Sequence, residues 1–225
     1  MKVTYIHHSG FLVETKRFYY LFDYESGALP AMDRKKPIFV LSSHSHADHY
    51  NPETFSLLSA MGMQQVQAVL SDDIAVPAGV NTLQVAPGKE YTLGEKQRLT
   101  TFLSTDLGVA FLLEDDGALI YHAGDLNDWV WDEETPEYNR QMTENYHRQI
   151  ALLAETLQHR VIDTAFVVLD PRQEADYDRG LLHFLAYIPV KAVYPMHYWD
   201  DPGIIDKFIK QHPRYSFEIQ HTEKR

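Results

Sequence analysis

The sequence lacks cysteine, an excess of basic residues and any long hydrophobic run. Without cysteine, disulfides and thiolate metal sites are excluded, and histidine and carboxylate remain as the strong metal ligands. The formal net charge is −12, and Lys and Arg do not cluster, which argues against nucleic acid as a partner. No apolar stretch reaches the length of a signal peptide core or a membrane span, so we expect a cytoplasmic protein with no membrane partner.

Short apolar runs separated by turn signals predict strands in the first part of the chain. We expect an antiparallel meander of three strands and then a buried fourth, at residues 3–7, 11–14, 18–22 and 38–41. A helix is expected to begin at Asn51 and Pro52. Further strands are expected at residues 66–70, 82–85, 99–103, 109–114 and 119–122.

Helices and strands alternate in the later part of the chain. Apolar residues at three- and four-residue intervals predict helices at residues 137–158, 179–188 and 204–211. Strands are expected at residues 165–169, 192–194 and 215–219. With 44% apolar residues in 225, the chain can bury one sizeable core. We therefore expect a single domain over residues 1–225, with two sheets back to back and helices on their outer faces.

The most informative stretch has the pattern His-x-His-x-Asp-His and directly follows the buried strand expected at residues 38–41. His44 and His46 are two residues apart, so in an extended backbone their imidazoles point to the same side and can hold one cation. Asp48 and His49 follow where the chain must turn, and they can bind a second cation beside the first. A polar surface loop can carry several histidines by chance, but this ordered spacing favours a metal site.

Two later residues lie just past expected strands. Asp125 follows Gly124, which lets the backbone turn sharply and present a carboxylate; capping of the next turn is the alternative. His197 follows the strand expected at residues 192–194, where a lone histidine is more often structural than metal-binding. Spacing alone therefore leaves both residues open.

Taken together, three motifs resemble the metallo-β-lactamase-fold superfamily of metallohydrolases, within it the branch similar to ascorbate-6-phosphate lactonase. They are His44-Ser45-His46-Ala47-Asp48-His49, Gly124-Asp125 and Pro195-Met196-His197, and they occur in the superfamily's order. Two N-terminal segments, Tyr5 to Glu14 and Leu21-Phe22-Asp23, also resemble the first strands of that branch. The likeness therefore spans nearly the whole chain.

The resemblance implies an α+β fold, a four-layer αββα sandwich with two divalent metal ions in a cleft at one edge. It implies that His44 and His46 bind the first ion, that Asp48, His49 and His197 bind the second, and that Asp125 bridges them. Zinc is the expected metal, with manganese and iron as alternatives.

One departure concerns the first ion. The family usually supplies it with a third histidine from the strand before the Gly-Asp motif, and this chain has no histidine in residues 102–108. The candidates to replace that ligand are Ser104, Thr105 and Asp106, then His7, His8 and His122, and finally water. A site with fewer protein ligands holds its ion less tightly, so a partly occupied first site or a single-metal enzyme is the alternative.

Other residues have expected roles around the ions. Asp48 is expected to orient the attacking water and His122 to give a proton to the leaving group. Asp23 either fixes an imidazole or caps a turn. Arg172 either clamps a substrate anion or pairs with Asp170 or Asp176. The tryptophans at positions 129, 131 and 199 either wall a pocket or cover the edge of the core.

The leading interpretation is a metal-dependent hydrolase that acts on a small-molecule ester, lactone or phosphoester. A phosphodiesterase or nuclease of the same fold is the first alternative, and the charge of −12 counts against it. A metal-binding protein with little catalysis and an iron-dependent oxidoreductase are the others.

Overall fold

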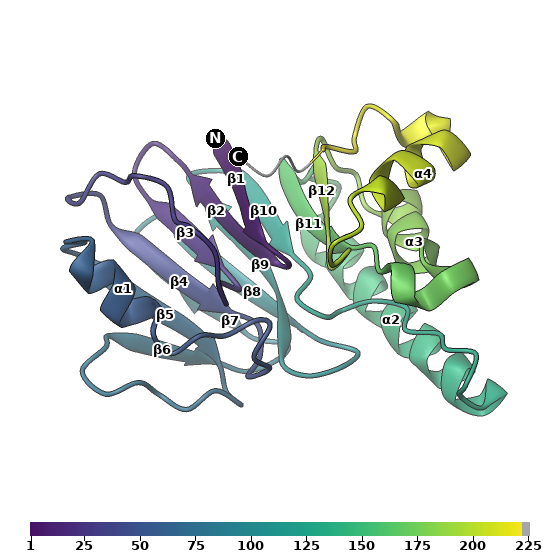
Figure 1. The fold of residues 1–225 in the computed structure, drawn as a ribbon, viewed down its shortest axis with the longest axis horizontal. Helices are drawn as coiled ribbons and strands as arrows, with labels where there is room; N and C mark the ends of the chain where they lie inside the picture. The colour runs from purple at the N-terminus through teal and green to yellow at the C-terminus, as the bar shows by residue number, and fades with distance from the viewer. Residues whose placement is uncertain (222–225) are drawn as a thin grey trace. The chain divides into compact units, whose positions relative to one another are not determined.

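The structure is a computed structural model that describes residues 1–221, and the chain divides into two compact units. The first unit contains Met1–Ala86 and the second begins at Pro87. Each unit has its own six-stranded sheet (Figure 1). The expectation of a single domain over residues 1–225 stays a prediction.

In the first unit, the strands lie in the sheet in the order in which they occur in the chain. They are β1 (Lys2–His7), β2 (Gly10–Glu14), β3 (Tyr19–Phe22), β4 (Ile38–Ser42), β5 (Val66–Ser71) and β6 (Thr82–Val85), with helix α1 (Thr54–Ala60) between β4 and β5. Leu58 of α1 packs into an apolar cluster with Leu12, Leu21 and Val40, so α1 covers the sheet face formed by β2, β3 and β4.

The expected antiparallel meander ends at β3. The pairs β1–β2 and β2–β3 are antiparallel, whereas β4 pairs with β3 in parallel, as do the later strands with their neighbours. A parallel pair needs a long crossover, and the segment at residues 23–37 supplies it. The ends of β3 and β4 therefore lie at the same edge of the sheet.

The second unit has a mixed sheet in the order β12-β11-β10-β9-β8-β7. Its strands are β7 (Glu90–Thr92), β8 (Gln97–Leu103), β9 (Val109–Asp115), β10 (Ala118–His122), β11 (Thr164–Val168) and β12 (Val193–Met196). Its helices are α2 (Pro136–Leu157), α3 (Arg179–Tyr187) and α4 (Gly203–Gln211), with short 3₁₀ helices η1 (Pro171–Asp176) and η2 (Pro213–Tyr215). β10, β11 and β12 are parallel neighbours, so their carboxyl ends share one edge.

Local sequence explains several of these elements. The two-residue turn between β9 and β10 places Asp116 at φ 49° and Gly117 at φ 90°, the left-handed conformations that such hairpins need. Thr135 begins α2 by accepting a hydrogen bond from the Tyr138 amide at 3.1 Å, and Pro136 occupies the first turn. The same helix buries Leu153 against the sheet while its neighbour Leu152 is exposed.

Two sequence predictions about strands were wrong. The strand expected at residues 215–219 is replaced by η2 and a single bridge between Val193 and Ile219. Phe217, in the middle of the expected strand, is 90% exposed, so this segment does not present a buried face around it. The short strand β7 was not predicted, because three residues are too few to show a periodicity. Within the described residues, no helix has the length and apolar character needed to span a membrane.

A stacked pair of histidines joins two helices of the second unit. His147 on α2 and His183 on α3 have ring centroids 3.7 Å apart and planes within 7° of parallel. Burial, and then the neighbouring His147, lower the pKa of His183 to about 4, although Asp128 opposes them. The folded protein thus favours the neutral ring.

We expect Leu153→Ala to lower the free energy of unfolding by about 2–5 kcal/mol, because it leaves a cavity between α2 and the sheet. Leu152→Ala, a matched change on the exposed face, should cost less than about 0.5 kcal/mol. Urea unfolding of the two variants measures both values. Equal losses would contradict the orientation of α2.

We expect the stability of the wild type to fall as the pH is lowered from about 6.5 towards 4, because the unfolded state then binds a proton that folded His183 does not. His183→Gln should reduce this slope, and the exposed control His159→Gln should leave it unchanged. Unfolding free energies measured across this pH range test the prediction, and an unchanged slope in His183→Gln would contradict it.

Candidate metal centre

Asp23 anchors the histidine motif of the first unit. It lies directly after β3 and is fully buried. Its Oδ1 accepts a hydrogen bond from the Ser43 amide, and its Oδ2 accepts one from the Ser43 hydroxyl, both at 2.7 Å. Oδ2 also lies 2.7 Å from Nδ1 of His49. Because the carboxylate holds the proton on Nδ1, the lone pair of His49 is on Nε2, the atom that then serves as metal ligand.

His44 and His46 form a pair just after β4. His44 Nε2 lies 3.0 Å from His46 Nδ1, and the two rings are nearly perpendicular. The Ser43 hydroxyl lies 3.0 Å from the other ring nitrogen of His44. His44 is buried and His46 is exposed. The two imidazole nitrogens therefore approach a common point, as the spacing predicted.

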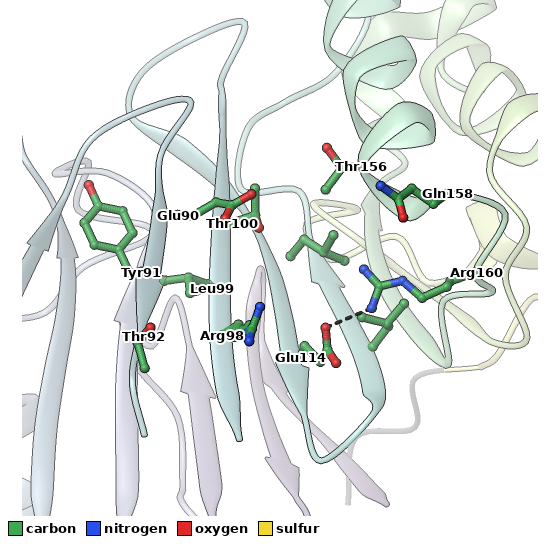
Figure 2. Close-up of a pocket in the computed structure, with 12 residues that line it drawn as sticks. Glu90, Tyr91, Thr92, Arg98, Leu99, Thr100, Glu114, Thr156, Gln158 and Arg160 are labelled. Carbon is green, nitrogen blue, oxygen red and sulfur yellow. Dashed lines mark hydrogen bonds and ion pairs between the residues drawn. The ribbon is translucent and has the colours of Figure 1, made fainter. Parts of the chain in front are cut away.

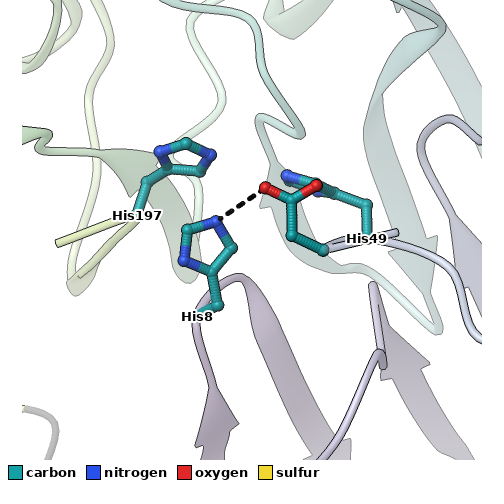
Figure 3. Close-up of side chains that lie close together, drawn as sticks. His8, His49 and His197 are labelled. Carbon is teal, nitrogen blue, oxygen red and sulfur yellow. Dashed lines mark ion pairs between the residues drawn. The ribbon is translucent and has the colours of Figure 1, made fainter. Parts of the chain in front are cut away.

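A second group in the same unit combines His8, Asp48 and His49. Each offers a ligand atom, and these atoms lie within 4.8 Å of one another. His8 Nε2 lies 3.5 Å from Asp48 Oδ2, the ion pair marked in Figure 3. His8 reaches this position from the turn between β1 and β2, where its φ is 49°. The sequence suggested His8 only as a ligand for the first ion. In the structure it lies instead beside Asp48 and His49, which were expected to bind the second ion.

In the second unit, three strand ends present a chain of polar contacts. Asp125 follows β10 through Gly124, whose φ of 52° makes the turn possible. Asp125 Oδ1 lies 3.3 Å from His197 Nε2, and His197 Nδ1 lies 2.8 Å from Asp170 Oδ2. Asp170 follows β11 and His197 follows β12. Two residues that were ambiguous in the sequence thus lie in contact.

The pKa of Asp170 reflects these contacts. Burial would raise it, but the hydrogen bonds from His197 and Arg172 outweigh burial and lower the pKa to about 2. Asp170 is therefore an anion that orients His197 through Nδ1, as Asp23 orients His49. The sequence suggested Asp170 only as a partner of Arg172. That ion pair is also present, with Nη2 of Arg172 at 2.5 Å from Oδ2.

Asp106 lies where the family's third histidine was expected. Carboxylate oxygens of Asp106 and Asp125 lie within 4.8 Å of each other. The other two candidates in this loop have structural contacts: Ser104 Oγ accepts a hydrogen bond from the Asp106 amide, and Thr105 Oγ1 bonds the backbone of Asn127 at 2.6 and 2.9 Å. Asp106 places its carboxylate beside that of Asp125, and the Thr105 hydroxyl donates a hydrogen bond to the Asp125 carbonyl at 3.4 Å.

His122 has contacts within the second unit. It is fully buried in β10, and its Nδ1 accepts a hydrogen bond from the Gly124 amide at 3.1 Å. Its ring packs against Phe166. His7, another candidate, pairs with Glu25. Proton donation by His122 stays a prediction.

A cavity of about 230 Å³ in the second unit adjoins Asp125 and His197. Trp129 and Trp131 stack on each other with centroids 5.7 Å apart, and they form part of its wall. The remaining lining residues are Thr105, Asp106, Tyr138, Met142 and Arg172. The expected aromatic wall agrees with this arrangement for Trp129 and Trp131, whereas Trp199 is not among the lining residues.

A larger hollow of about 390 Å³ lies over β7, β8 and β9 beside the end of α2 (Figure 2). It contains the ion pair between Arg160 and Glu114, and the exposed Arg98. It shares no lining residue with the cavity beside Asp125 and includes no candidate ligand.

The donor set fits divalent metal ions. All candidate ligands are imidazoles or carboxylates, which suit zinc, manganese and iron. His49 and His197 are also held at Nδ1 by buried carboxylates, an arrangement typical of metal-binding histidines.

Comparison with known proteins identifies the family. The model of the beta-lactamase superfamily domain matches residues 2–140, more than half of the chain. This chain belongs to the metallo-β-lactamase superfamily. Among curated proteins, none matches it.

Solved structures of this superfamily's fold resemble the chain at low identity. Igni18, a metallo hydrolase from the archaeon Ignicoccus hospitalis, is 17% identical with a TM-score of 0.70, over 98% of this chain and 94% of that one. CmlA, a diiron β-hydroxylase from Streptomyces venezuelae, is 12% identical with a TM-score of 0.59, over 96% of this chain and 52% of that one. Zn²⁺-bound PqqB from Methylobacterium extorquens is 13% identical with a TM-score of 0.56, over 96% of this chain and 85% of that one. With two mixed six-stranded sheets and flanking helices, the predicted metallo-β-lactamase fold class is confirmed.

We expect Asp23→Asn to weaken metal binding by about 10–100-fold, because an asparagine amide can donate to Nδ1 of His49 and favour the tautomer with its proton on Nε2. Competition with a chromophoric chelator measures the affinity. Asp72→Asn, the same change at an exposed position of this unit, should bind metal like the wild type. Equal affinities of the two variants would contradict the orienting role of Asp23.

Proposed function

We propose that the protein is a metal-dependent hydrolase of small esters, lactones or phosphoesters, similar to the ascorbate-6-phosphate lactonase branch of the superfamily. The observation that carries the proposal is the same in both units. In each one, imidazole and carboxylate ligands gather at the ends of parallel strands, and a buried carboxylate fixes a histidine at Nδ1. A buried carboxylate on the second ring nitrogen is typical of a histidine that binds a metal ion.

In the proposed centre, the expected imidazole and carboxylate ligands would hold two ions. His44 and His46 bind the first together with Asp106, which replaces the histidine that this chain lacks. Asp48, His49 and His197 bind the second, and His8 joins them. Asp125 bridges the two, a role supported by its place beside both Asp106 and His197. With Asp106 included, the first site has a full set of protein ligands.

When bound, two divalent ions lower the pKa of a water molecule and polarise the substrate oxygen. The chain's own residues supply the rest. Asp48, whose side chain is about 39% exposed, would orient the attacking water, and His8 Nε2 lies 3.5 Å from its Oδ2. Trp129 and Trp131 keep bulk water from one side of the cavity.

Zinc is the metal we propose, as in the PqqB structure, whereas the carboxylate pair of Asp106 and Asp125 also suits iron or manganese. That pair favours one second candidate, an iron-dependent oxidoreductase; the structurally similar CmlA is a diiron β-hydroxylase. Activity with zinc in the absence of oxygen separates the two functions, because hydrolysis needs no oxidant.

We expect the wild type to bind two ions per chain and to hydrolyse members of a panel of esters, lactones and bis-aryl phosphates. Asp106→Asn should retain the second ion and bind the first more than about 100-fold more weakly, since it loses a direct ligand rather than an outer hydrogen bond. Hydrolysis should fall with the loss of that ion. Elemental mass spectrometry and the panel assay measure both effects.

Asp132→Asn, at an exposed position of the same unit, is the control. Its metal content and its rate of hydrolysis should match those of the wild type. A wild type that binds no transition metal would refute the centre as a whole. Two bound ions without any hydrolysis would favour the metal-binding alternative. Full occupancy in Asp106→Asn would remove Asp106 from the ligand set.

A further inference from the structure

Arg172 has one hydrogen-bonding edge engaged by Asp170, and its side chain lines the cavity beside Asp125. Arg172 lies in the first turn of η1, two residues after the Asp170 that follows β11. Its Nε lies 3.0 Å from both oxygens of Asp170, and its Nη2 lies 2.5 Å from Oδ2. Across residues 1–221, the structure has no hydrogen bond or ion pair from its Nη1. The side chain is 49% exposed and lines the cavity beside Asp125.

The position of the guanidinium is fixed from several sides. Asp170 holds one edge, and the ring of Trp199 lies 4.5 Å from its central carbon. Trp131 lies at 5.9 Å. Aromatic faces within about 6 Å attract a guanidinium and restrict its rotation. The Nη1 edge is therefore pre-organised, which lowers the entropy lost when it binds a ligand.

The cavity combines this cation with a flat apolar wall. Arg172 is the one lysine or arginine among its described lining residues. Trp129 and Trp131 are within 5° of parallel, and Met142 adds apolar surface from α2. Its volume of about 230 Å³ is below the roughly 300–1,000 Å³ of sites for drug-sized ligands. It suits a small molecule with one flat part and one anionic group.

We propose that Arg172 determines substrate specificity by binding a carboxylate or phosphate group of a small substrate whose flat part lies against Trp129 and Trp131. This inference rests on the proposed function, because Asp106 and Asp125 repel an anion unless bound cations neutralise them. A planar guanidinium matches either anion through two parallel hydrogen bonds. The competing explanation is that Arg172 only neutralises Asp170 and so helps to position His197.

The test measures ligand binding to the zinc-loaded protein by calorimetry, with three probes that share a phenyl ring. Benzoate carries a carboxylate, phenylphosphonate carries a phosphonate, and benzamide is neutral. We expect the wild type to bind at least one anion more tightly than benzamide, and the stronger of the two identifies the preferred group. In Arg172→Gln the affinity for that anion should fall by about 10–100-fold, with benzamide binding unchanged.

Two further variants sharpen the result. Arg172→Lys keeps the charge without the planar fork, so it should restore only part of the anion affinity. Arg98→Gln removes a positive charge from the hollow in Figure 2 and should bind all probes like the wild type. The metal content of every variant is measured in parallel, and metal-free wild type should lose anion binding.

The proposal is overturned if Arg172→Gln binds the anions as tightly as the wild type does. It is also overturned if anion and benzamide affinities fall together, or if the variant loses zinc, because Arg172 then acts through Asp170 and His197. Zinc content and hydrolysis of a neutral ester by the wild type report on the proposed function separately. A zinc-loaded hydrolase that does not prefer the anions would refute the specificity proposal alone.

Discussion

Two buried carboxylates, one in each compact unit, hold a histidine ring by its Nδ1 atom. Asp23 does so for His49 and Asp170 for His197, at 2.7 and 2.8 Å. Asp23 and Asp170 are fully buried, and an anion is stable there only because hydrogen-bond donors surround it. Each pair fixes a tautomer and a ring direction. The chemistry that we propose depends on this pre-organisation more than on the number of histidines.

Sheet topology explains why these pairs form. Parallel neighbours end at the same edge, so β3 and β4 bring Asp23 to the histidine motif, and β10, β11 and β12 bring Asp125, Asp170 and His197 together. Ligands in α/β sheets are typically bound beyond the carboxyl ends of such strands. Arg172 follows one of these ends, which places a fixed cation in the cavity that is lined by three candidate ligands, Asp106, Asp125 and His197.

Much of this arrangement could be predicted from the sequence, because motif and strand occur together. The His-x-His-x-Asp-His pattern follows a buried strand, and the hairpin at Asp116-Gly117 and the cap at Thr135 are local signals. The position of His8 depends on a left-handed turn, and that of Asp106 on how its loop packs against Asn127, which spacing does not show. The parallel pairing of β4 was missed because strand direction is set by tertiary contacts.

The central claim is that the imidazole and carboxylate groups gathered at these strand ends bind two divalent metal ions. Anomalous X-ray diffraction at the zinc edge, from crystals of the zinc-loaded protein, tests it most directly. The account predicts two anomalous peaks, one beside His44, His46 and Asp106 and the other beside His8, Asp48, His49 and His197, with Asp125 as a ligand of both. A single peak, or no peak near the histidine motif, would contradict it.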